Sequence, residues 1–263
     1  MRHSYKTLAW ETRDRVLWIR LNRPDTMNAV DDDLHYELSL VFEDADRDPE
    51  SDVVVLTGSG RAFCAGGLAS WMEQKAEHPD EFREILPDTK RIVFSQLQME
   101  KPIICALNGA AAGLGASIAL MCDLIVAADT ATIGDPHVRM GFVAGDGGPV
   151  ILPQLVGYAR AKEMLLLGSM LSAEEARSMG LINRVVPAAE LEAATEKLAL
   201  QLARGAKWAI RWTKTVTNIP LRRLAQDLMD ASVAYEMASN LTTDHREAVR
   251  AFIEKRRPVF TGN

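Results

Sequence analysis

One histidine and two aspartates stand close together in the segment GDPHVRMGFVAGDGG, residues 134–148, which is otherwise rich in glycine and apolar residues. His137 can exchange a proton near neutral pH, and Asp146 can orient the ring or share its proton. Nine positions and two intervening glycines separate these side chains, so one helix face cannot present both. A turn must therefore bring them together, which predicts a loop site for acid–base chemistry. The alternative is a hydrogen-bonded structural histidine and an aspartate that stabilises its own turn.

Two glycine-rich turns could bind the oxyanion of such a reaction. They are GRAFCAGGLAS (60–70) and NGAAAGLGAS (108–117), and each follows an apolar run and precedes a helical pattern. Small residues leave backbone N–H groups uncovered, and those at the start of a helix have no partner within the helix. The alternative is that the glycines only permit tight turns and close packing. Residues 113–115 also begin a GxGxxG pattern, but Ile118 replaces its third glycine, which argues against a dinucleotide site.

The elements that must position these turns alternate along the chain. Apolar, β-branched runs predict strands at 16–21, 52–58, 102–107, 123–129 and 180–186, and helical periodicity follows the acidic residues 31–33. Further helical patterns cover 80–100, 114–122, 158–168 and 172–179. This alternation predicts an α/β fold. Beyond about residue 187 the pattern is largely helical, so we divide the chain into a core at 1–200 and a helical region at 201–263.

Composition narrows the possible functions. The chain has 263 residues, of which 48% are hydrophobic and 25% charged, enough for one large domain, and its formal charge of −6 argues against nucleic-acid binding. Its three cysteines do not form a metal-binding or disulfide pattern, which favours the reducing cytoplasm. The first ten residues lack the apolar stretch of a signal peptide. Residues 103–122 carry no charge and are long enough to span a membrane, but Asn108 and three glycines favour a strand, a turn and a buried helix.

Four blocks, in order, carry a family resemblance: LNRPDTMNAV (21–30), VVLTGSGRAFCAGG (54–67), NGAAAGLGASIALMCDLIVAAD (108–129) and MLSAEEARSMGLINRVVP (170–187). Together they resemble the crotonase, or enoyl-CoA hydratase/isomerase, superfamily over almost the whole chain. The resemblance implies a spiral of repeated ββα units, C-terminal helices used in trimerisation, and a homotrimer or a hexamer built as a dimer of trimers. It implies an acyl-CoA substrate, with coenzyme A as part of that substrate, and neither a metal nor a permanently bound cofactor. It also places two backbone donors for the thioester oxygen at Gly67 and Leu114.

The sequence departs from the family pattern where hydratases carry their two catalytic glutamates. Ser117 and His137 stand at those positions, and Leu68 replaces the usual aspartate of the first turn. A serine cannot act unaided as a general base, so water addition by two glutamates does not carry over. The spacing of His137 and Asp146 resembles a family member that cleaves a carbon–carbon bond between two carbonyls.

The resulting function hypothesis is an enzyme that stabilises a thioester enolate. The reaction is hydrolysis of a carbon–carbon bond or double-bond isomerisation, with His137 and Asp146 moving protons. The alternatives are an enoyl-CoA hydratase, or a non-catalytic member that binds acyl-CoA or RNA. We expect no nucleic acid and no membrane as partners.

The resemblance also implies contacts to coenzyme A. These fall on Arg23, Met27, Asn28, Ala65 and Gly66, with Leu68 and Ser117 nearer the thioester, and on Lys255 and Arg256 for the phosphates. The two basic residues could equally form an ordinary charged helix end. Trp71 and Met72 are expected in the acyl pocket or the core, and His3, His35, His78 and His245 at the surface.

Overall fold

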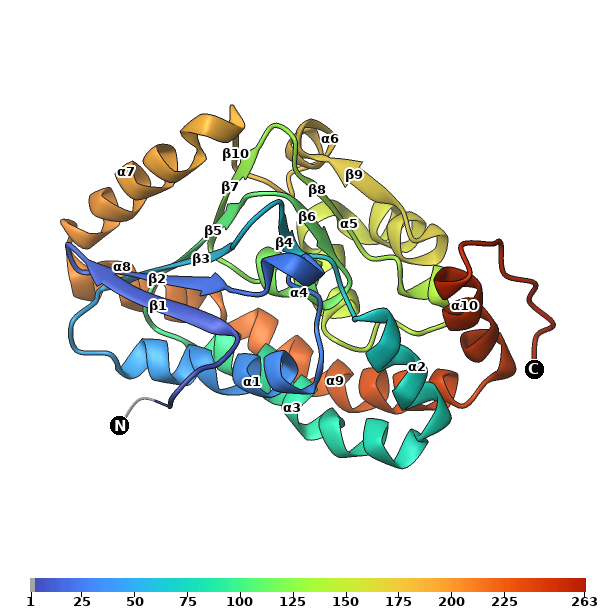
Figure 1. Ribbon diagram of the computed structural model, residues 1–263. Coiled ribbons are helices and arrows are strands. Elements are labelled where there is room, and N and C mark those ends of the chain that lie inside the picture. The colour runs from blue at the N-terminus through green and yellow to red at the C-terminus, as the bar shows by residue number, and fades with distance from the viewer. Residues whose placement is uncertain (1–2) are drawn as a thin grey trace.

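Two sheets share the centre of the molecule, which is a computed structural model that describes residues 3–263 (Figure 1). The larger sheet has the strand order β1-β2-β3-β5-β7-β10 and the smaller one β4-β6-β8-β9. The strands are β1 (Leu8–Arg13), β2 (Val16–Leu21), β3 (Val53–Gly58), β4 (Ala62–Cys64), β5 (Ile103–Leu107), β6 (Ala110–Ala112), β7 (Leu124–Ala128), β8 (Thr132–Gly134), β9 (Met170–Ser172) and β10 (Arg184–Val186).

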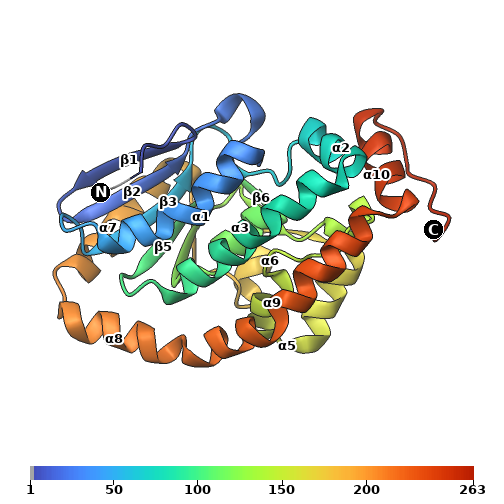
Figure 2. The same ribbon diagram turned by 90° about the horizontal axis from the view of Figure 1, so that it is seen from below.

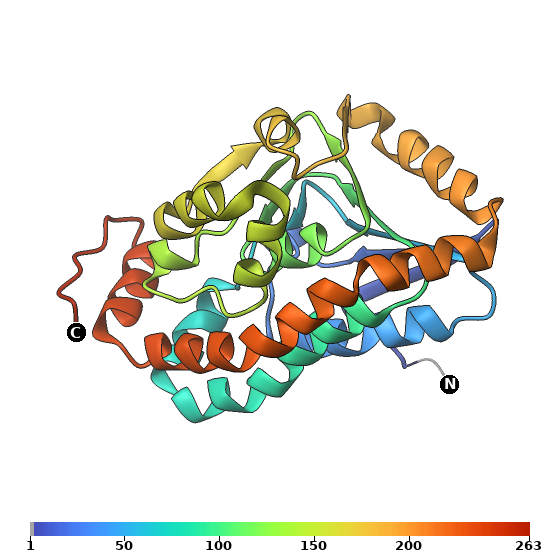
Figure 3. The same cartoon turned by 180° about the vertical axis from the view of Figure 1, so that it is seen from behind.

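Helices surround both sheets. The α-helices are α1 (Asp32–Arg47), α2 (Ala69–Glu77), α3 (Pro79–Gln98), α4 (Leu114–Leu120), α5 (Gly148–Leu167), α6 (Ala173–Ser178), α7 (Leu191–Ala203), α8 (Lys207–Thr217), α9 (Ile219–Asn240) and α10 (Thr243–Ile253). Three short 3-10 helices are η1 (Pro24–Thr26), η2 (His137–Met140) and η3 (Ala188–Glu190). Helices α8 and α9 run one after the other along one edge and lead to α10 (Figures 2 and 3).

The two sheets arise from a repeated ββα unit. Strands β3, β5 and β7 pair in parallel in the larger sheet, and each is followed at once by a short strand, β4, β6 or β8, of the smaller sheet. Each pair of strands then leads through a turn into helices. Because the units stack in register, the turns after β4, β6 and β8 lie side by side, and these turns carry the residues singled out above.

The apolar runs of the sequence form the core. All six residues of β3 and all five of β5 are buried, as a strand covered on both faces requires. Trp18, Phe42 and Phe63 are among the largest fully buried side chains. Asp31 caps the N-terminus of helix α1, and its carboxylate accepts a hydrogen bond from the backbone N–H of Leu34 at 3.1 Å.

The predicted α/β alternation is confirmed, with differences at the ends of elements. The predicted strand at 180–186 is shorter, because residues 180–183 form a turn and a link to β10. The pattern at 158–168 matches only the second half of α5, which starts at Gly148 and is interrupted by a non-helical Gly157 with φ of 76°. The short strands β4, β6 and β8 were not predicted, because three residues are too few to show a hydrophobic period.

The uncharged segment 103–122 forms β5, β6 and α4, as its turn residues predicted. Among residues 3–263, no helix is long and apolar enough to cross a membrane. Helix α7, from Leu191 to Ala203, spans the predicted boundary near residue 200. The division of the chain at this point stays a prediction.

Candidate active site

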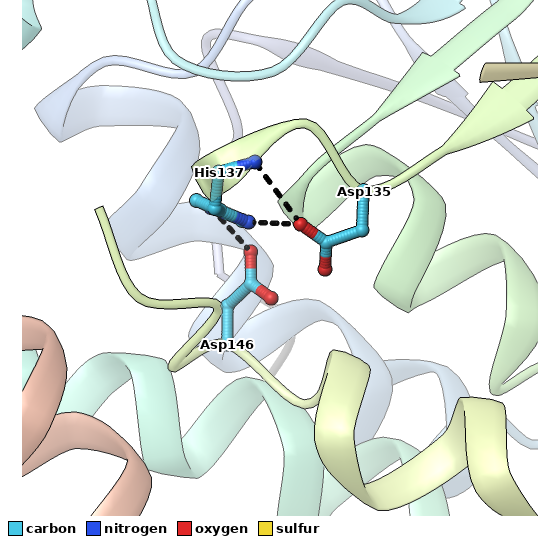
Figure 4. Close-up of side chains that lie close together, drawn as sticks. All are labelled: Asp135, His137 and Asp146. Carbon is cyan, nitrogen blue, oxygen red and sulfur yellow. Dashed lines mark hydrogen bonds and ion pairs between the residues drawn. The ribbon is translucent and has the colours of Figure 1, made fainter. Parts of the chain in front are cut away.

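His137 lies between two buried aspartates (Figure 4). Its Nδ1 is 2.5 Å from Asp135 Oδ1, and its Nε2 is 3.4 Å from Asp146 Oδ2. The Asp135 and Asp146 side chains are only 3% and 5% exposed, and that of His137 is 16% exposed. The imidazole can therefore exchange a proton with Asp146 at Nε2, while Asp135 holds Nδ1.

The local backbone explains why these three residues meet. Asp135 directly follows β8, and the short helix η2 begins at His137, whose backbone N–H donates to Asp135 Oδ1 at 3.2 Å. Gly141 then takes the left-handed conformation, with φ of 61°, and turns the chain back. Gly147, with φ of 112°, ends this loop directly after Asp146. The predicted encounter of His137 and Asp146 through a glycine turn is thus what the structure has.

Asp146 is also tied to the helix that follows the second glycine turn. Ser117 Oγ donates a hydrogen bond of 2.8 Å to Asp146 Oδ1, and Ser117 is 1% exposed. Ser117 therefore positions the aspartate. It occupies the place where hydratases carry a glutamate, but its hydroxyl is already engaged with a carboxylate.

The three side chains share charge rather than titrating independently. Burial by itself would lower the pKa of His137, but the charges of Asp135 and Asp146 outweigh it and raise this pKa to about 10. Burial by itself would raise the pKa of Asp135, but the adjacent imidazolium of His137 outweighs this effect and lowers the pKa of that carboxyl. Burial raises the pKa of Asp146, and the imidazolium opposes this only in part. The sequence-based expectation of an ordinary histidine pKa is wrong, because the second aspartate was not considered.

Glu236 is a buried acidic residue of this cavity that sequence reasoning missed. It lies on α9, is 5% exposed, and lines the same cavity as His137 and Asp146. A Cβ at Gly145 would collide with its carboxylate, so the glycine before Asp146 makes room for it. Burial raises the pKa of Glu236 well above its ordinary value, and the charge of Asp146 adds to this effect. Its Oε2 is buried and has no hydrogen-bond partner among residues 3–263.

A signal for Glu236 was present in the sequence. The buried residues of α9 are Ala225, Met229, Val233, Glu236 and Asn240, which recur at helical spacing on one face. A carboxylate on that apolar face is expensive to bury unless it is paired or protonated. The position of Glu236 on the core-facing side of α9 therefore indicates an unusual buried carboxyl. His137 and Asp146, which line the same cavity, lie about a hundred residues earlier in the chain.

The cavity between these groups measures about 70 Å³. Its walls are Val30, His35, Gly67, Trp71, Met72, Phe82, Ile85, Thr89, Leu114, His137, Phe142, Asp146 and Glu236. Trp71 and Met72 thus line the predicted acyl pocket. The backbone N–H groups of Gly67 and Leu114 make no hydrogen bond to any described residue, and both residues lie on this wall. They are free to donate to one oxygen atom inside the cavity.

The second glycine turn also fits around His137. Gly113 has φ of 55° and ψ of −123°, and a Cβ there would lie 3.0 Å from His137 Cε1. The absence of a side chain lets the imidazole pack directly against the turn that ends in the Leu114 donor. The packing interpretation therefore holds for Gly113, and the role of Leu114 as an oxyanion donor stays a prediction.

Two histidines are not at the surface, contrary to the prediction. His35 is 3% exposed and lies on the cavity wall, and His245 is 2% exposed, with its Nδ1 2.8 Å from the carbonyl oxygen of Met140. His35 belongs to the buried face of α1, and the ring of Phe142 stacks on His245 at 4.6 Å. Isolated histidines without a motif gave no sequence signal for this burial.

The residues predicted to hold coenzyme A fall into two groups. The Arg23–Asn28 segment lies beside the first glycine turn, since the Ala65 N–H donates to Met27 at 3.1 Å and the Leu68 N–H to Val30 at 2.8 Å. Asn28 is fully buried and donates to Ser59 and Ala62, so its side chain holds the two segments together.

The side chains of several of these residues are already engaged. Arg23 pairs with Asp31. The guanidinium of Arg256 pairs with Glu247 and Glu254. Arg256 follows α10 and is the neighbour of Lys255 in the chain. No hydrogen bond or ion pair within 3–263 joins these last two residues to Arg23 or Asn28. The contacts of this group with coenzyme A stay predictions.

The cluster of Asp135, His137 and Asp146 also satisfies the spacing of a metal site, with one ligand atom of each residue within 4.8 Å of the others. The two carboxylates, however, face opposite nitrogens of one ring (Figure 4). A single ion could take only one of those nitrogens, whereas a proton can be held at either. The arrangement therefore suits proton transfer better than metal binding.

Comparisons with known proteins agree with this architecture. Residues 11–263 match the family model of enoyl-CoA hydratase/isomerase. The chain is 33% identical to 1,2-epoxyphenylacetyl-CoA isomerase of Escherichia coli, covering 94% of this chain and 95% of that protein. It is 32% identical to crotonyl-CoA hydratase of Syntrophomonas wolfei, covering 98% of each.

A solved structure shows the same fold. An enoyl-CoA hydratase/isomerase from Mycobacterium paratuberculosis superposes with a TM-score of 0.91 at 33% identity, covering 94% of this chain and 99% of that one. The family match spans nearly the whole chain, and the fold is the predicted spiral of ββα units. The chain therefore belongs to the enoyl-CoA hydratase/isomerase, or crotonase, superfamily of acyl-CoA enzymes.

Proposed function

We propose that the protein hydrolyses a carbon–carbon bond of a β-oxo acyl-CoA thioester. The observation that carries this proposal is one small cavity lined by the His137–Asp146 pair, by Glu236, whose carboxyl pKa burial raises well above its ordinary value, and by the two residues with free backbone donors. Hydrolysis of such a substrate needs a base for water, a donor for the second carbonyl and an oxyanion site for the thioester. The cavity offers each of these once.

The reaction balances with one water molecule. The carboxylate of Asp146, held beside the His137 imidazolium, takes a proton from water, and the resulting hydroxide forms a bond to the β-carbon and opens its C=O bond while Glu236 donates a hydrogen bond to the β-carbonyl oxygen. The bond between the α- and β-carbons then breaks, and its electron pair becomes the thioester enolate. The Gly67 and Leu114 N–H groups stabilise the enolate oxygen, and each such donor contributes about 3–4 kcal/mol in comparable enzymes. The pair returns its proton to the α-carbon, which gives a carboxylic acid and a shorter acyl-CoA.

Glu236 is expected to be the group that makes the cavity selective for a β-oxo substrate. We expect Glu236→Leu to lower kcat on such a substrate by about a hundredfold, because one donor to a developing oxyanion is lost. Glu236→Gln retains an N–H donor and should lose less. Steady-state kinetics on the two variants check this order. Equal losses in both variants would contradict a donor role and leave only packing.

Double-bond isomerisation is the second candidate; the similarity to 1,2-epoxyphenylacetyl-CoA isomerase supports an isomerase without specifying a double-bond shift. It needs only removal of a proton next to the thioester and its return two carbons away. The His137–Asp146 pair can both remove and return this proton. Glu236 would then line the cavity as a neutral side chain without taking part in the proton transfer. Hydration by two glutamates lacks support, since Ser117 donates to Asp146 and His137 is held between two aspartates.

A panel of acyl-CoA esters followed by mass spectrometry distinguishes these reactions. Carbon–carbon hydrolysis gives two products whose masses sum to substrate plus water, isomerisation leaves the mass unchanged, and hydration adds one water to a single product. Turnover of crotonyl-CoA at ordinary hydratase rates would contradict the proposal. Binding of RNA or acyl-CoA without any turnover would support a non-catalytic member instead.

We infer a homotrimer or a dimer of trimers, located in the cytoplasm. The support for self-association is an apolar stripe on α8, where Trp208, Trp212 and Val216 are 53%, 57% and 63% exposed and recur every four residues. The support for the location is the composition, with three free and buried cysteines.

We expect Trp212→Glu to shift the protein to smaller species in light scattering, because a charge would have to be buried at the interface. Tyr36→Glu, at an equally exposed aromatic of α1, serves as the control. A wild-type monomer, or an unchanged mass of the Trp212 variant, would remove α8 from the interface.

A further inference from the structure

His35 lies on the wall of the acyl cavity and has one buried ring nitrogen without a hydrogen-bond partner among the described residues. The residue lies on the buried face of α1 and is 3% exposed. Its Nε2 is 3.1 Å from Thr89 Oγ1, and its Nδ1 is buried without a hydrogen-bond partner in the described part of the chain. His35, Thr89 and Trp71 line the same cavity as Leu114 and His137. A buried polar atom without a partner is costly, so an unmatched nitrogen at a ligand cavity calls for an occupant.

Thr89 decides which nitrogen of His35 carries the proton. The hydroxyl of Thr89 points to the carbonyl oxygen of Ile85 at 3.4 Å, one turn earlier in α3, as helical threonines commonly do. With its own proton directed there, the Thr89 oxygen accepts from His35, so Nε2 carries the hydrogen. Nδ1 then offers a lone pair, and it can only accept a hydrogen bond.

The surroundings keep this ring neutral. Burial lowers the pKa of His35 to about 4, and the nearby charges of Asp32 and Lys75 act in opposite directions. These two charges are also paired with each other, since Lys75 Nζ lies 2.9 Å from Asp32 Oδ1. At neutral pH the cavity therefore meets a fixed acceptor on this wall rather than a cation.

We propose that the acyl group of the substrate carries a hydroxyl whose hydrogen is accepted by His35 Nδ1, which makes His35 a specificity-determining residue. This inference rests on the proposed acyl-CoA function and adds a feature to the substrate. A hydroxyl satisfies the nitrogen, whereas a ketone would bring a second acceptor against it and a methylene would leave it unpaired. The remaining lining near it, Ile85 and Trp71, suits the carbon body of the same acyl group.

The test uses thioether analogues of acyl-CoA, which cannot react, so binding is measured apart from turnover. Each set of three carries a methylene, a hydroxyl or a ketone at the same carbon, with that carbon moved from the third to the sixth along the chain. Titration calorimetry on wild-type protein should show one position at which the hydroxyl analogue binds about tenfold more tightly than the methylene analogue, because a buried acceptor gains its partner. The ketone analogue should show no such gain.

The variant His35→Phe keeps a ring of similar size without the acceptor. We expect it to bind the hydroxyl and methylene analogues equally, and His78→Phe, at the exposed C-cap of α2, to keep the wild-type preference. Equal binding of the three analogues at every position by wild-type protein would overturn the inference, and this comparison stands even if the His35 variant does not fold. A preference that persists in His35→Phe would also overturn it.

The acyl-CoA function and the role of His35 can fail separately. Binding of the analogues without any hydroxyl preference leaves the acyl-CoA function in place and removes the role of His35. Failure of every coenzyme A analogue to bind overturns the function and the inference together.

Discussion

Replacement of His137 by alanine is expected to lower kcat by about two to four orders of magnitude, because proton transfer to and from the substrate depends on the His137–Asp146 pair. Asp146→Asn should cause a similar loss while keeping the hydrogen bond from Ser117. Binding of a non-reactive acyl-CoA analogue should change little, since the Gly67 and Leu114 donors remain. Steady-state kinetics and calorimetry on the same preparations measure both quantities.

A double variant and a control make this result interpretable. The His137→Ala and Asp146→Asn double variant should be far less impaired than the product of the single effects, because the two residues act as one unit. Ser117→Ala should cost much less, since Ser117 orients Asp146 and transfers no proton itself. Near-wild-type turnover of both single variants would return His137 and Asp146 to a structural role.

Asp135→Asn is expected to reduce the free energy of unfolding by about 3–5 kcal/mol at pH 6, the usual result of removing one charge from a buried ion pair. Asp135 lies 2.5 Å from His137 Nδ1 and its side chain is 3% exposed, so neither charge can turn to water instead. Asp135 acts through His137 as a positioning residue. The variant should therefore also lower the pKa of His137, which a merely structural role for Asp135 would leave unchanged.

The pH dependence of this loss follows from the direction of each shift. The pKa of Asp135 is lowered in the folded protein, so its contribution is present above the ordinary value of 3.8 and is lost as the pH falls through the folded value. The pKa of His137 is raised from 6.5 to about 10, so its contribution is full below 6.5 and is lost as the pH rises through 10. The difference in unfolding free energy between wild type and Asp135→Asn should thus be greatest between about pH 4 and 6.5.

Urea denaturation at pH 6 and pH 10, together with NMR titration of the His137 ring, measures both effects. A difference in stability that stays constant between these two pH values would show that the pair is not charged in the folded state. Thr132→Ser in β8, whose side chain is outside the cluster, is a suitable control for small changes near this strand.

The sequence by itself determined the family, the α/β alternation and the His137–Asp146 pair of the candidate site. Strands β2, β3 and β5 are continuous apolar runs, and a run buried on both faces is visible without tertiary information. The two glycines between His137 and Asp146, at positions 141 and 145, predicted a turn that brings these side chains together, because such turns depend on local backbone freedom.

Tertiary structure alone decided which other groups join that pair and how they titrate. Asp135 was in the same quoted segment, but its contact with His137 depends on where β8 ends against the helix η2. Glu236 and His35 arrive from α9 and α1, about a hundred residues away in each direction along the chain, through helix packing. A pKa depends on burial and on every charge nearby, and neither is a property of local sequence. Residue type and spacing therefore indicated His137 and Asp146 as candidate proton carriers, while their charge states and the polarity of the cavity followed only from the packed fold.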